Sequence, residues 1–227
     1  VTWIGDCAFS DCSSLADIVV SDNVTYIGDR MISQTAYYND PSNWDEGSVL
    51  YLGNHLIEVK SERLPKHYTV RTGTKTIRGN SFYDCESLKF IEIPDSVTSI
   101  GYSAFKGCSS LTSISIPNSV TSIGGYAFYD CRNLESIDIS DSVTCINDFT
   151  FANCSSLTSV TIPDGVTSIS YYAFEDCTGL ISISIPDSLT TISDRAFYGC
   201  SSLSEFVVED GNSMYASCKG VLFDKDC

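Results

Sequence analysis

Residues 108–130 read CSSLTSISIPNSVTSIGGYAFYD, and a copy of the same pattern begins immediately afterwards at Cys131. Counted from each cysteine as position 0, Leu recurs at +3, an apolar residue at +6 and +8, Val or Leu at +12, Ile at +15 and Phe at +20. A fixed period of 23 residues over most of a chain indicates a repeat architecture. The cysteines in phase are Cys85, Cys108, Cys131, Cys154, Cys177 and Cys200, and Cys12 opens an earlier, weaker copy.

Each repeat carries the pattern of one short coil. The segment L-x-x-I-x-I from +3 to +8 alternates and is rich in β-branched residues, which is typical of a strand. Pro and polar turn residues follow, V-T-x-I gives a second extended piece, and A-F-x-x-C suits a short turn, which we expect to be a single 3₁₀ turn. One coil cannot bury its own apolar residues, so the coils must stack, about 4.8 Å apart. The sequence therefore predicts a mostly β solenoid with a parallel sheet on one face.

The strand and its continuation P-[DN]-[SG]-V-T-x-I-G-x-x-A-F-x-x-C resemble the leucine-rich repeats, and specifically the BspA-type repeats of bacterial and protist surface proteins. The resemblance covers about residues 1–30 and 68–208. It implies a leucine-rich-repeat solenoid, an extracellular or cell-surface location and a role in adhesion. The Asn that usually follows the strand is replaced, so the buried Asn ladder of better-known families is not expected. The replacements are Ser96, Ser119, Ser142, Gly165 and Ser188.

We expect a single solenoid over residues 1–227. Its first coils occupy residues 1–32, an insertion occupies 33–67, and regular coils follow over 68–208. Within the insertion, GSVLYLGNHLIEV predicts a β-hairpin, because two apolar runs flank the turn dipeptide Gly53-Asn54. Residues 209–227 loosely repeat the sequence of the insertion, and we interpret them as the start of a second hairpin, cut off before its return strand.

The chain contains eleven cysteines, most of them at one phase of the repeat. One cysteine per coil gives a ladder of parallel side chains that point inward, whereas a disulfide needs two converging Cβ vectors. We therefore expect the ladder thiols to be reduced and buried as small apolar groups. Neither a C-x₂-C pair nor a His partner accompanies them, so no zinc site is predicted. Cys218 and Cys227, outside the ladder, are candidates for a disulfide.

The chain is strongly acidic, with 29 Asp and Glu against 13 Lys and Arg and a net charge of -16. Such a surface repels phosphate backbones and anionic lipid, which disfavours nucleic-acid and membrane-surface partners. The sequence has no apolar run of membrane-spanning length, so no membrane insertion is expected. It also lacks the motifs of nucleotide-binding, dinucleotide-binding and hydrolytic enzymes, so we expect neither catalysis nor a cofactor.

Two sets of residues are candidate contacts for a ligand. On the predicted strands, side chains at +5 and +7 point out of the sheet. Before the hairpin, we expect Tyr37, Tyr38 and Trp44 to remain partly exposed, and exposed Tyr and Trp are typical anchors of binding surfaces. The alternatives are that the strand residues are simply small and polar, and that the insertion only packs against its neighbours. The strand candidates are Phe90, Glu92, Ser113, Ser115, Ser136, Asp138, Ser159, Thr161, Ser182 and Ser184.

Two classes of function fit these features. The resemblance implies a non-catalytic, secreted or cell-surface module that binds proteins or glycans of host or neighbouring cells. Alternatively, the chain is a structural spacer within a larger surface protein. A spacer should adjoin a catalytic, sugar-binding or docking domain, whereas an adhesin can consist of repeats throughout.

Overall fold

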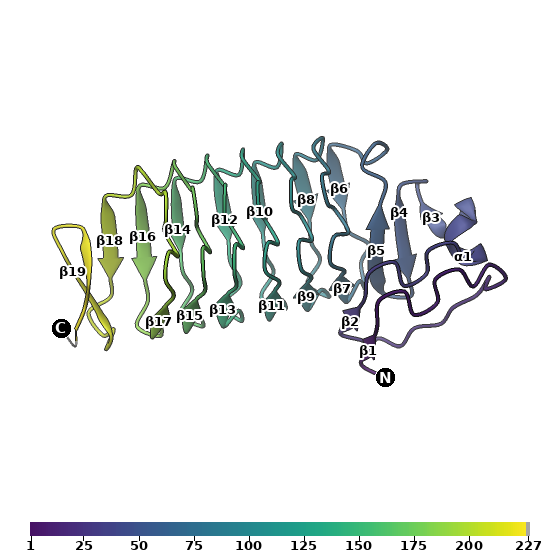
Figure 1. Ribbon diagram of the computed structural model, residues 1–227, viewed down its shortest axis with the longest axis horizontal. Coiled ribbons are helices and arrows are strands. Elements are labelled where there is room, and N and C mark those ends of the chain that lie inside the picture. The colour runs from purple at the N-terminus through teal and green to yellow at the C-terminus, as the bar shows by residue number, and fades with distance from the viewer. Residues whose placement is uncertain (226–227) are drawn as a thin grey trace.

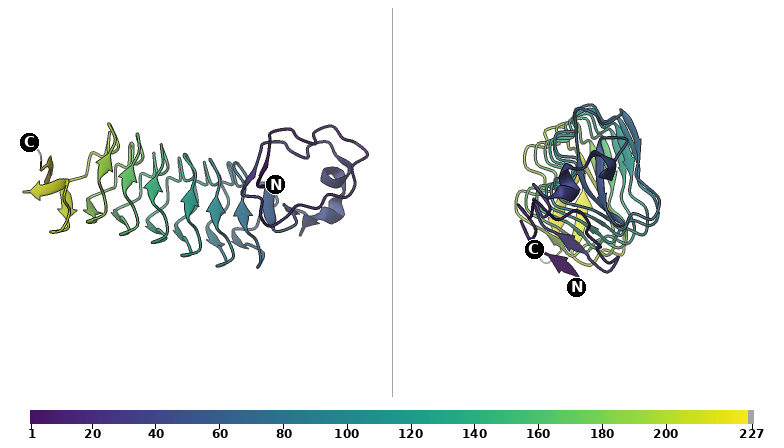
Figure 2. Two further views of the ribbon diagram at one scale, coloured as in Figure 1. Left: turned by 90° about the horizontal axis from the view of Figure 1, so that it is seen from below. Right: turned by 90° about the vertical axis from the view of Figure 1, so that its right-hand side faces the viewer.

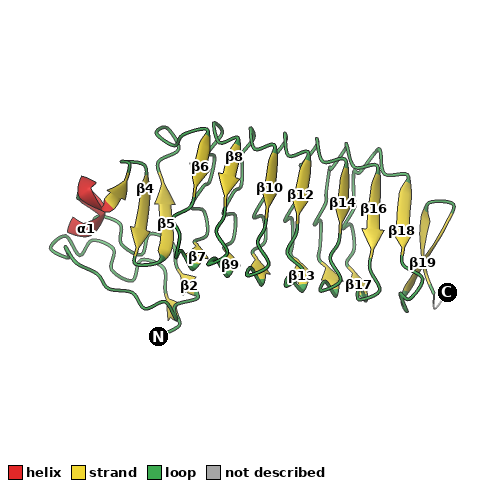
Figure 3. Ribbon diagram, turned by 180° about the vertical axis from the view of Figure 1, so that it is seen from behind, coloured by secondary structure: helices red, strands yellow, loops and turns green. Residues whose placement is uncertain are grey.

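The computed structural model describes residues 1–225, which form an elongated solenoid of stacked coils (Figure 1). Almost all regular structure is β, and the helical turns lie near the N-terminal end of the rod (Figure 3). Seen along the rod, the coils lie over one another (Figure 2). The predicted solenoid is therefore confirmed. The helical turns are α1 (Ala36–Asn39) and the 3₁₀ turn η1 (Pro41–Asn43).

The L-x-x-I-x-I segments form the predicted parallel strands. Neighbouring strands pair with an offset of one repeat, so that Ser113 lies opposite Ser136 and Ile114 opposite Ile137. The middle residue points into the core and its two neighbours face solvent in most of these strands. The strands are β6 (His67–Thr69), β8 (Phe90–Glu92), β10 (Ser113–Ser115), β12 (Ser136–Asp138), β14 (Ser159–Thr161), β16 (Ser182–Ile185) and β18 (Glu205–Val208).

The V-T-x-I segments form a second column of two-residue strands, which also pair in parallel one repeat apart. Ile at +15 closes each strand and is buried in most coils. The coil thus turns its two apolar patches towards one interior. The strands are β7 (Thr76–Ile77), β9 (Ser99–Ile100), β11 (Ser122–Ile123), β13 (Cys145–Ile146), β15 (Ser168–Ile169) and β17 (Thr191–Ile192).

The stretch before each cysteine forms consecutive β-turns in place of the predicted 3₁₀ turn. Its N–H groups alternate in direction: Ala127 donates to the carbonyl three residues earlier at 3.2 Å, whereas Phe128 donates to Thr150 of the next coil at 2.9 Å. This path needs left-handed backbone at +18 and +22, as at Tyr126 (φ 58°) and Asp130 (φ 63°). Because every second N–H bonds the neighbouring coil, these turns hold the coils together, which a self-bonded 3₁₀ helix could not do.

The phenylalanines at +20 form a continuous stack of rings inside the coils. The centroids of Phe105 and Phe128 are 5.3 Å apart with planes 3° from parallel, and those of Phe128 and Phe151 are 5.6 Å apart. Five consecutive members, from Phe82 to Phe174, have no exposed surface. This stack and the Leu, Ile and Val of the same coils make up the main core.

The ladder cysteines are free thiols, as predicted, and those from Cys85 to Cys177 are fully buried. Each thiol from Cys108 onward donates to the carbonyl of a phenylalanine in an earlier coil, as Cys131 Sγ does to Phe105 O at 3.2 Å. Burial raises the pKa of Cys85 to about 12. Cys227, the predicted partner of Cys218, lies outside the described residues.

The insertion builds three antiparallel strands: β3 (Trp44–Asp45), β4 (Val49–Leu52) and β5 (His55–Val59). The predicted hairpin is therefore present, with Gly53 in the left-handed region at its turn (φ 57°). Its return strand β5 also pairs in parallel with β7, where His55 lies opposite Thr76. The hairpin thus takes the place of a second-column strand and continues the stack.

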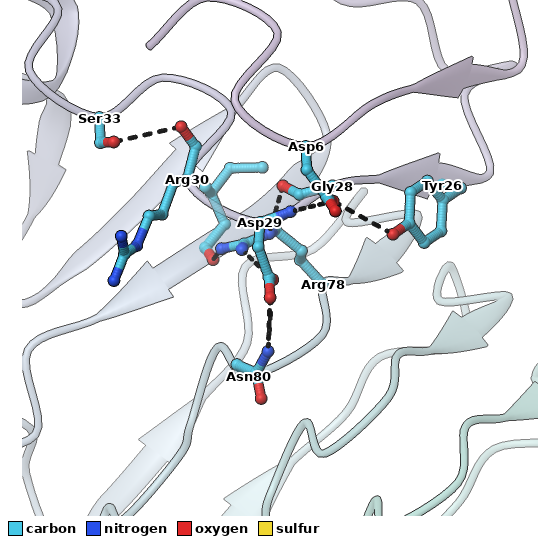
Figure 4. A network of polar contacts seen from close by, with 9 residues as sticks. Asp6, Tyr26, Gly28, Asp29, Arg30, Ser33, Arg78 and Asn80 are labelled. Atoms are coloured by element: carbon cyan, nitrogen blue, oxygen red, sulfur yellow. Dashed lines mark hydrogen bonds and ion pairs between the residues drawn. The ribbon is translucent and has the colours of Figure 1, made fainter. Parts of the chain in front are cut away.

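The N-terminal coils form one parallel pair, β1 (Trp3–Ile4) with β2 (Tyr26–Ile27), and are joined to the rest by Arg78. The Arg78 guanidinium is almost wholly buried and donates to the carbonyls of Gly28 and Ile57 and to the Asp29 carboxylate at 2.5 Å (Figure 4). It therefore connects the first coils, the hairpin and the regular coils in one cluster.

At the C-terminal end, β19 (Tyr215–Cys218) and β20 (Val221–Asp224) form an antiparallel pair. Their turn residues Lys219 and Gly220 have left-handed backbone, as do Glu46 and Gly47 between β3 and β4. The predicted start of a second hairpin corresponds to β20, whereas its partner β19, which precedes it, was not predicted. The pair corresponds to β3 and β4.

Candidate functional site

The predicted strand contacts lie together on one surface, which we call the sheet face and define as the +5 and +7 residues of β6 to β18. Phe90, Glu92, Asp138 and Thr161 are exposed, as are the serines of β10 and β12 and Ser159. Only Ser182 and Ser184, near the C-terminal end, are half-buried. Parallel pairing one repeat apart, within the groups β6–β8, β10–β12 and β14–β16–β18, places equivalent side chains in rows along the rod.

The serine hydroxyls on the strands β10, β12 and β14 of the sheet face are free to bind. Within the described residues, those of Ser113, Ser136 and Ser159 make no hydrogen bond to the protein. By contrast, the threonine hydroxyls at +13 are used internally: Thr121 and Thr167 donate to carbonyls of the preceding coil. The two sets have similar residue types, but these serines leave their donors and acceptors to solvent or a ligand.

The sheet face begins one strand earlier than the sequence predicted. His67 and Thr69 on β6 are exposed and lie opposite Phe90 and Glu92. The ring centroids of His67 and Phe90 are 4.6 Å apart, and the Thr69 hydroxyl donates to Glu92 Oε2 at 3.0 Å. Counting back one period from Phe90 and Glu92 would have found both residues, which the predicted boundary of the insertion hid.

The aromatic residues of the insertion are placed differently from the prediction. Trp44 is only 5% exposed, and its indole N–H donates to Tyr38 O at 2.9 Å, so its expected exposure is wrong. Tyr37 and Tyr38 are half-buried in α1, where their hydroxyls donate to Tyr51 O and to the Glu58 carboxylate. The rings of Tyr37, Tyr38 and Trp44 pack in a second core cluster formed by the hairpin and the first coils. They shield the apolar residues at this end of the rod from water.

His55, one of the two histidines of the insertion, is a packing residue. It is fully buried, with Nδ1 2.8 Å from Thr76 Oγ1 and Nε2 3.2 Å from the Ser21 carbonyl. A carbonyl only accepts, so Nε2 carries the proton and Nδ1 accepts from the threonine. Burial lowers the pKa of His55, which keeps the ring neutral.

A cavity of about 190 Å³ lies beside the Arg78 cluster, between the N-terminal coils and β7. Its two carboxylates already have partners: Asp29 pairs with Arg78 and accepts from the Asn80 amide, and Asp6 Oδ1 accepts from the Asp29 N–H and the Tyr26 hydroxyl (Figure 4). We therefore interpret these two carboxylates as structural.

The model of the BspA type leucine rich repeat region matches six copies in residues 1–42 and 75–216. The chain belongs to this family. The match covers the N-terminal coils and the regular coils, and it omits most of the insertion. No curated protein sequence matches the BspA-type chain.

Solved structures of bacterial leucine-rich repeat proteins resemble the BspA-type chain. A leucine-rich repeat protein of T. pallidum is 29% identical over 68% of this chain and 75% of its own, with a TM-score of 0.64. One from Bacteroides ovatus is 27% identical over 92% of this chain and 47% of its own (TM-score 0.59). One from Eubacterium ventriosum is 29% identical over 62% and 37% (TM-score 0.55). The chain thus spans less than half of the latter two.

The described part of the chain contains no group of three or more His, Cys, Asp or Glu side chains placed to hold a metal ion. None of its helices is long and apolar enough to cross a membrane.

Proposed function

We propose that the chain is a non-catalytic binding module of a secreted or cell-surface protein, and that the sheet face contacts proteins or glycans of host or neighbouring cells. The observation that carries this proposal is the row of exposed hydroxyls without protein partners, repeated from coil to coil. Extended surfaces of this kind are what solenoids offer to large ligands. Membership of the BspA-type family supports the extracellular location.

The sheet face suits many weak polar contacts. Hydroxyl groups donate and accept, and they tolerate both peptide and sugar partners. The rows are interrupted by the carboxylates of Glu92 and Asp138 and by the ring of Phe90. These side chains differ from their neighbours and would fix the position of a ligand along the rod. Affinity would come from the number of strands engaged.

The test is a binding screen of the intact chain against matrix proteins, glycans and whole cells, followed by two variants. Ser113→Arg with Ser159→Arg places bulk and charge on the sheet face, and the matched control Ser122→Arg with Ser201→Arg adds the same two charges at exposed serines elsewhere. We expect the first variant to lose binding and the control to keep it. Unchanged binding by the first variant would remove the sheet face from the proposal.

A spacer role is the second candidate, and the unbroken ring stack from Phe82 to Phe197 favours it, because such a core makes a stiff rod. It predicts that the chain binds nothing in the same screen. It also predicts that shortening the array by one repeat changes the reach of the parent protein without changing its ligands.

A further inference from the structure

A second exposed surface runs along the outside of the β-turns at +17 to +22 of each repeat, and we call it the turn face. Four of its tyrosines, at positions 83, 102, 171 and 198, are 45%, 56%, 53% and 59% exposed. These tyrosines do not recur at one phase of the 23-residue period, so the repeat pattern does not reveal them. The aromatic residues of the turn face are Tyr83, Tyr102, Tyr126, Tyr129, Phe149, Tyr171, Tyr172 and Tyr198.

The inner rings of the turn face sit on backbone that does not favour them. Tyr126, Phe149 and Tyr172 have φ values of 58°, 55° and 55°, a left-handed conformation that costs an L-residue about 1–2 kcal/mol. Their centroids stack at 4.6 and 4.9 Å, and each aromatic pair returns about 0.5–1.5 kcal/mol. Asn80 and Ser103 occupy the same position in other coils, so the fold does not require a ring there. We therefore attribute these rings to the function of the surface and not to the stability of the fold.

Two of the chain's own cations lie against the rings of the turn face. Lys106 Nζ lies 5.5, 5.7 and 5.0 Å from the ring centroids of Tyr83, Tyr126 and Tyr129. Arg195 lies over the ring of Tyr172 at 5.8 Å and donates to its hydroxyl at 2.5 Å. Ammonium and guanidinium groups are attracted to aromatic rings at these distances.

Between these two cations the turn face is acidic. Residues 107–194 contain a single base, Arg132, and it is paired with Asp130 at 2.7 Å. Burial, and then the neighbouring Asp176, raise the pKa of Glu175, and the charge of Arg195 offsets only part of this rise. The acidic side chains of the turn face are Asp84, Asp130, Asp148, Glu175, Asp176 and Asp194.

We propose that the turn face is a binding site, separate from the sheet face, for an Arg- or Lys-rich segment of a partner protein. Partner cations would continue the pattern that Lys106 and Arg195 begin, with rings and carboxylates alternating along the rod. The carboxylates along the turn face favour a basic segment over a neutral sugar. The same negative charge repels phosphate backbones and disfavours nucleic acid.

The experiment measures binding of a labelled deca-arginine peptide to the intact chain by fluorescence anisotropy at about 0.15 M salt, where interactions of separated surface charges are screened. Glu175→Gln with Asp176→Asn removes two charges from the turn face. The matched control, Asp95→Asn with Asp164→Asn, removes two charges from exposed residues outside it. Tyr171→Ala removes an exposed ring, and Trp3→Ala removes one elsewhere.

We expect the turn-face charge pair and Tyr171→Ala each to raise the Kd about fivefold or more, and both controls to change it less than about twofold. Thermal unfolding verifies that every variant is folded. Equal weakening by the two charge pairs would reduce the binding to net charge and overturn the proposal, as would the absence of peptide binding. Tyr171-dependent binding of chitohexaose without peptide binding would replace the basic partner by a glycan. None of these outcomes depends on the sheet face.

Discussion

Replacing Phe128 with Ala removes one ring from the centre of the buried stack. Phe128 has no exposed surface and lies between Phe105 and Phe151, at 5.3 and 5.6 Å. Deleting a buried Phe side chain costs about 3–5 kcal/mol, and least where the walls can collapse. Here they cannot close, because hydrogen bonds between coils, such as Phe128 N–H to Thr150 O, fix their spacing. We expect a loss of about 4 kcal/mol in the free energy of unfolding.

Urea unfolding followed by circular dichroism measures this loss, and Phe197→Ala is the matched control. Phe197 is half-buried in the last coil, where it stacks on Phe174 at 5.4 Å and meets Phe206 edge-on. Its deletion should cost about half as much, because it leaves less cavity. A loss below about 1 kcal/mol for Phe128→Ala, or equal losses for the two variants, would contradict a continuous buried stack.

Three further predictions concern the thiols and the insertion. Alkylation of the native chain should spare the ladder thiols from Cys108 to Cys177 because they are buried, and mass spectrometry should find them modified only after denaturation. Arg78→Met leaves the buried carbonyls it serves without a donor, so it should cost about 1–3 kcal/mol and make the N-terminal coils the first target of limited proteolysis. The pKa of His55 is lower folded than unfolded, so its share of stability is constant above the unfolded value of about 6.5 and falls as the pH drops below it. Denaturation between pH 7.5 and 5 should therefore show a pH dependence that His55→Gln reduces and His67→Gln does not.

The regular coils could be predicted because the same residues of each repeat determine the strands, their pairing and the core. The recurrent apolar positions of each repeat set strand alternation, register and core, so the parallel pairs one period apart, such as Ile114 with Ile137, follow from counting. Inward thiols followed from the same phase. The sheet face was equally predictable, since strand alternation alone decides which side chains point outward.

The insertion and the turns could not be predicted in the same way, because they depend on contacts without a period. Trp44 resembled an exposed loop ring until β3 and α1 placed it against the hairpin, which no local pattern encodes. The turns before each cysteine depend on N–H groups that bond the next coil, as Phe128 does. A single sequence indicates where the chain turns, but not which carbonyl of the next coil each N–H bonds. The rings of the turn face were not predicted because their position in the repeat shifts between +17, +18 and +21.

Hydroxyl-radical footprinting of the free chain tests the stacked-coil account most directly, because it reports the exposure of individual aromatic side chains. The account predicts rapid oxidation of Phe90, Tyr102 and Tyr171, which lie 41%, 56% and 53% exposed on the two outer faces. It predicts protection of Phe105, Phe128 and Phe151 until the chain unfolds. Oxidation of Phe128 in the native chain at the rate of Tyr171 would contradict it.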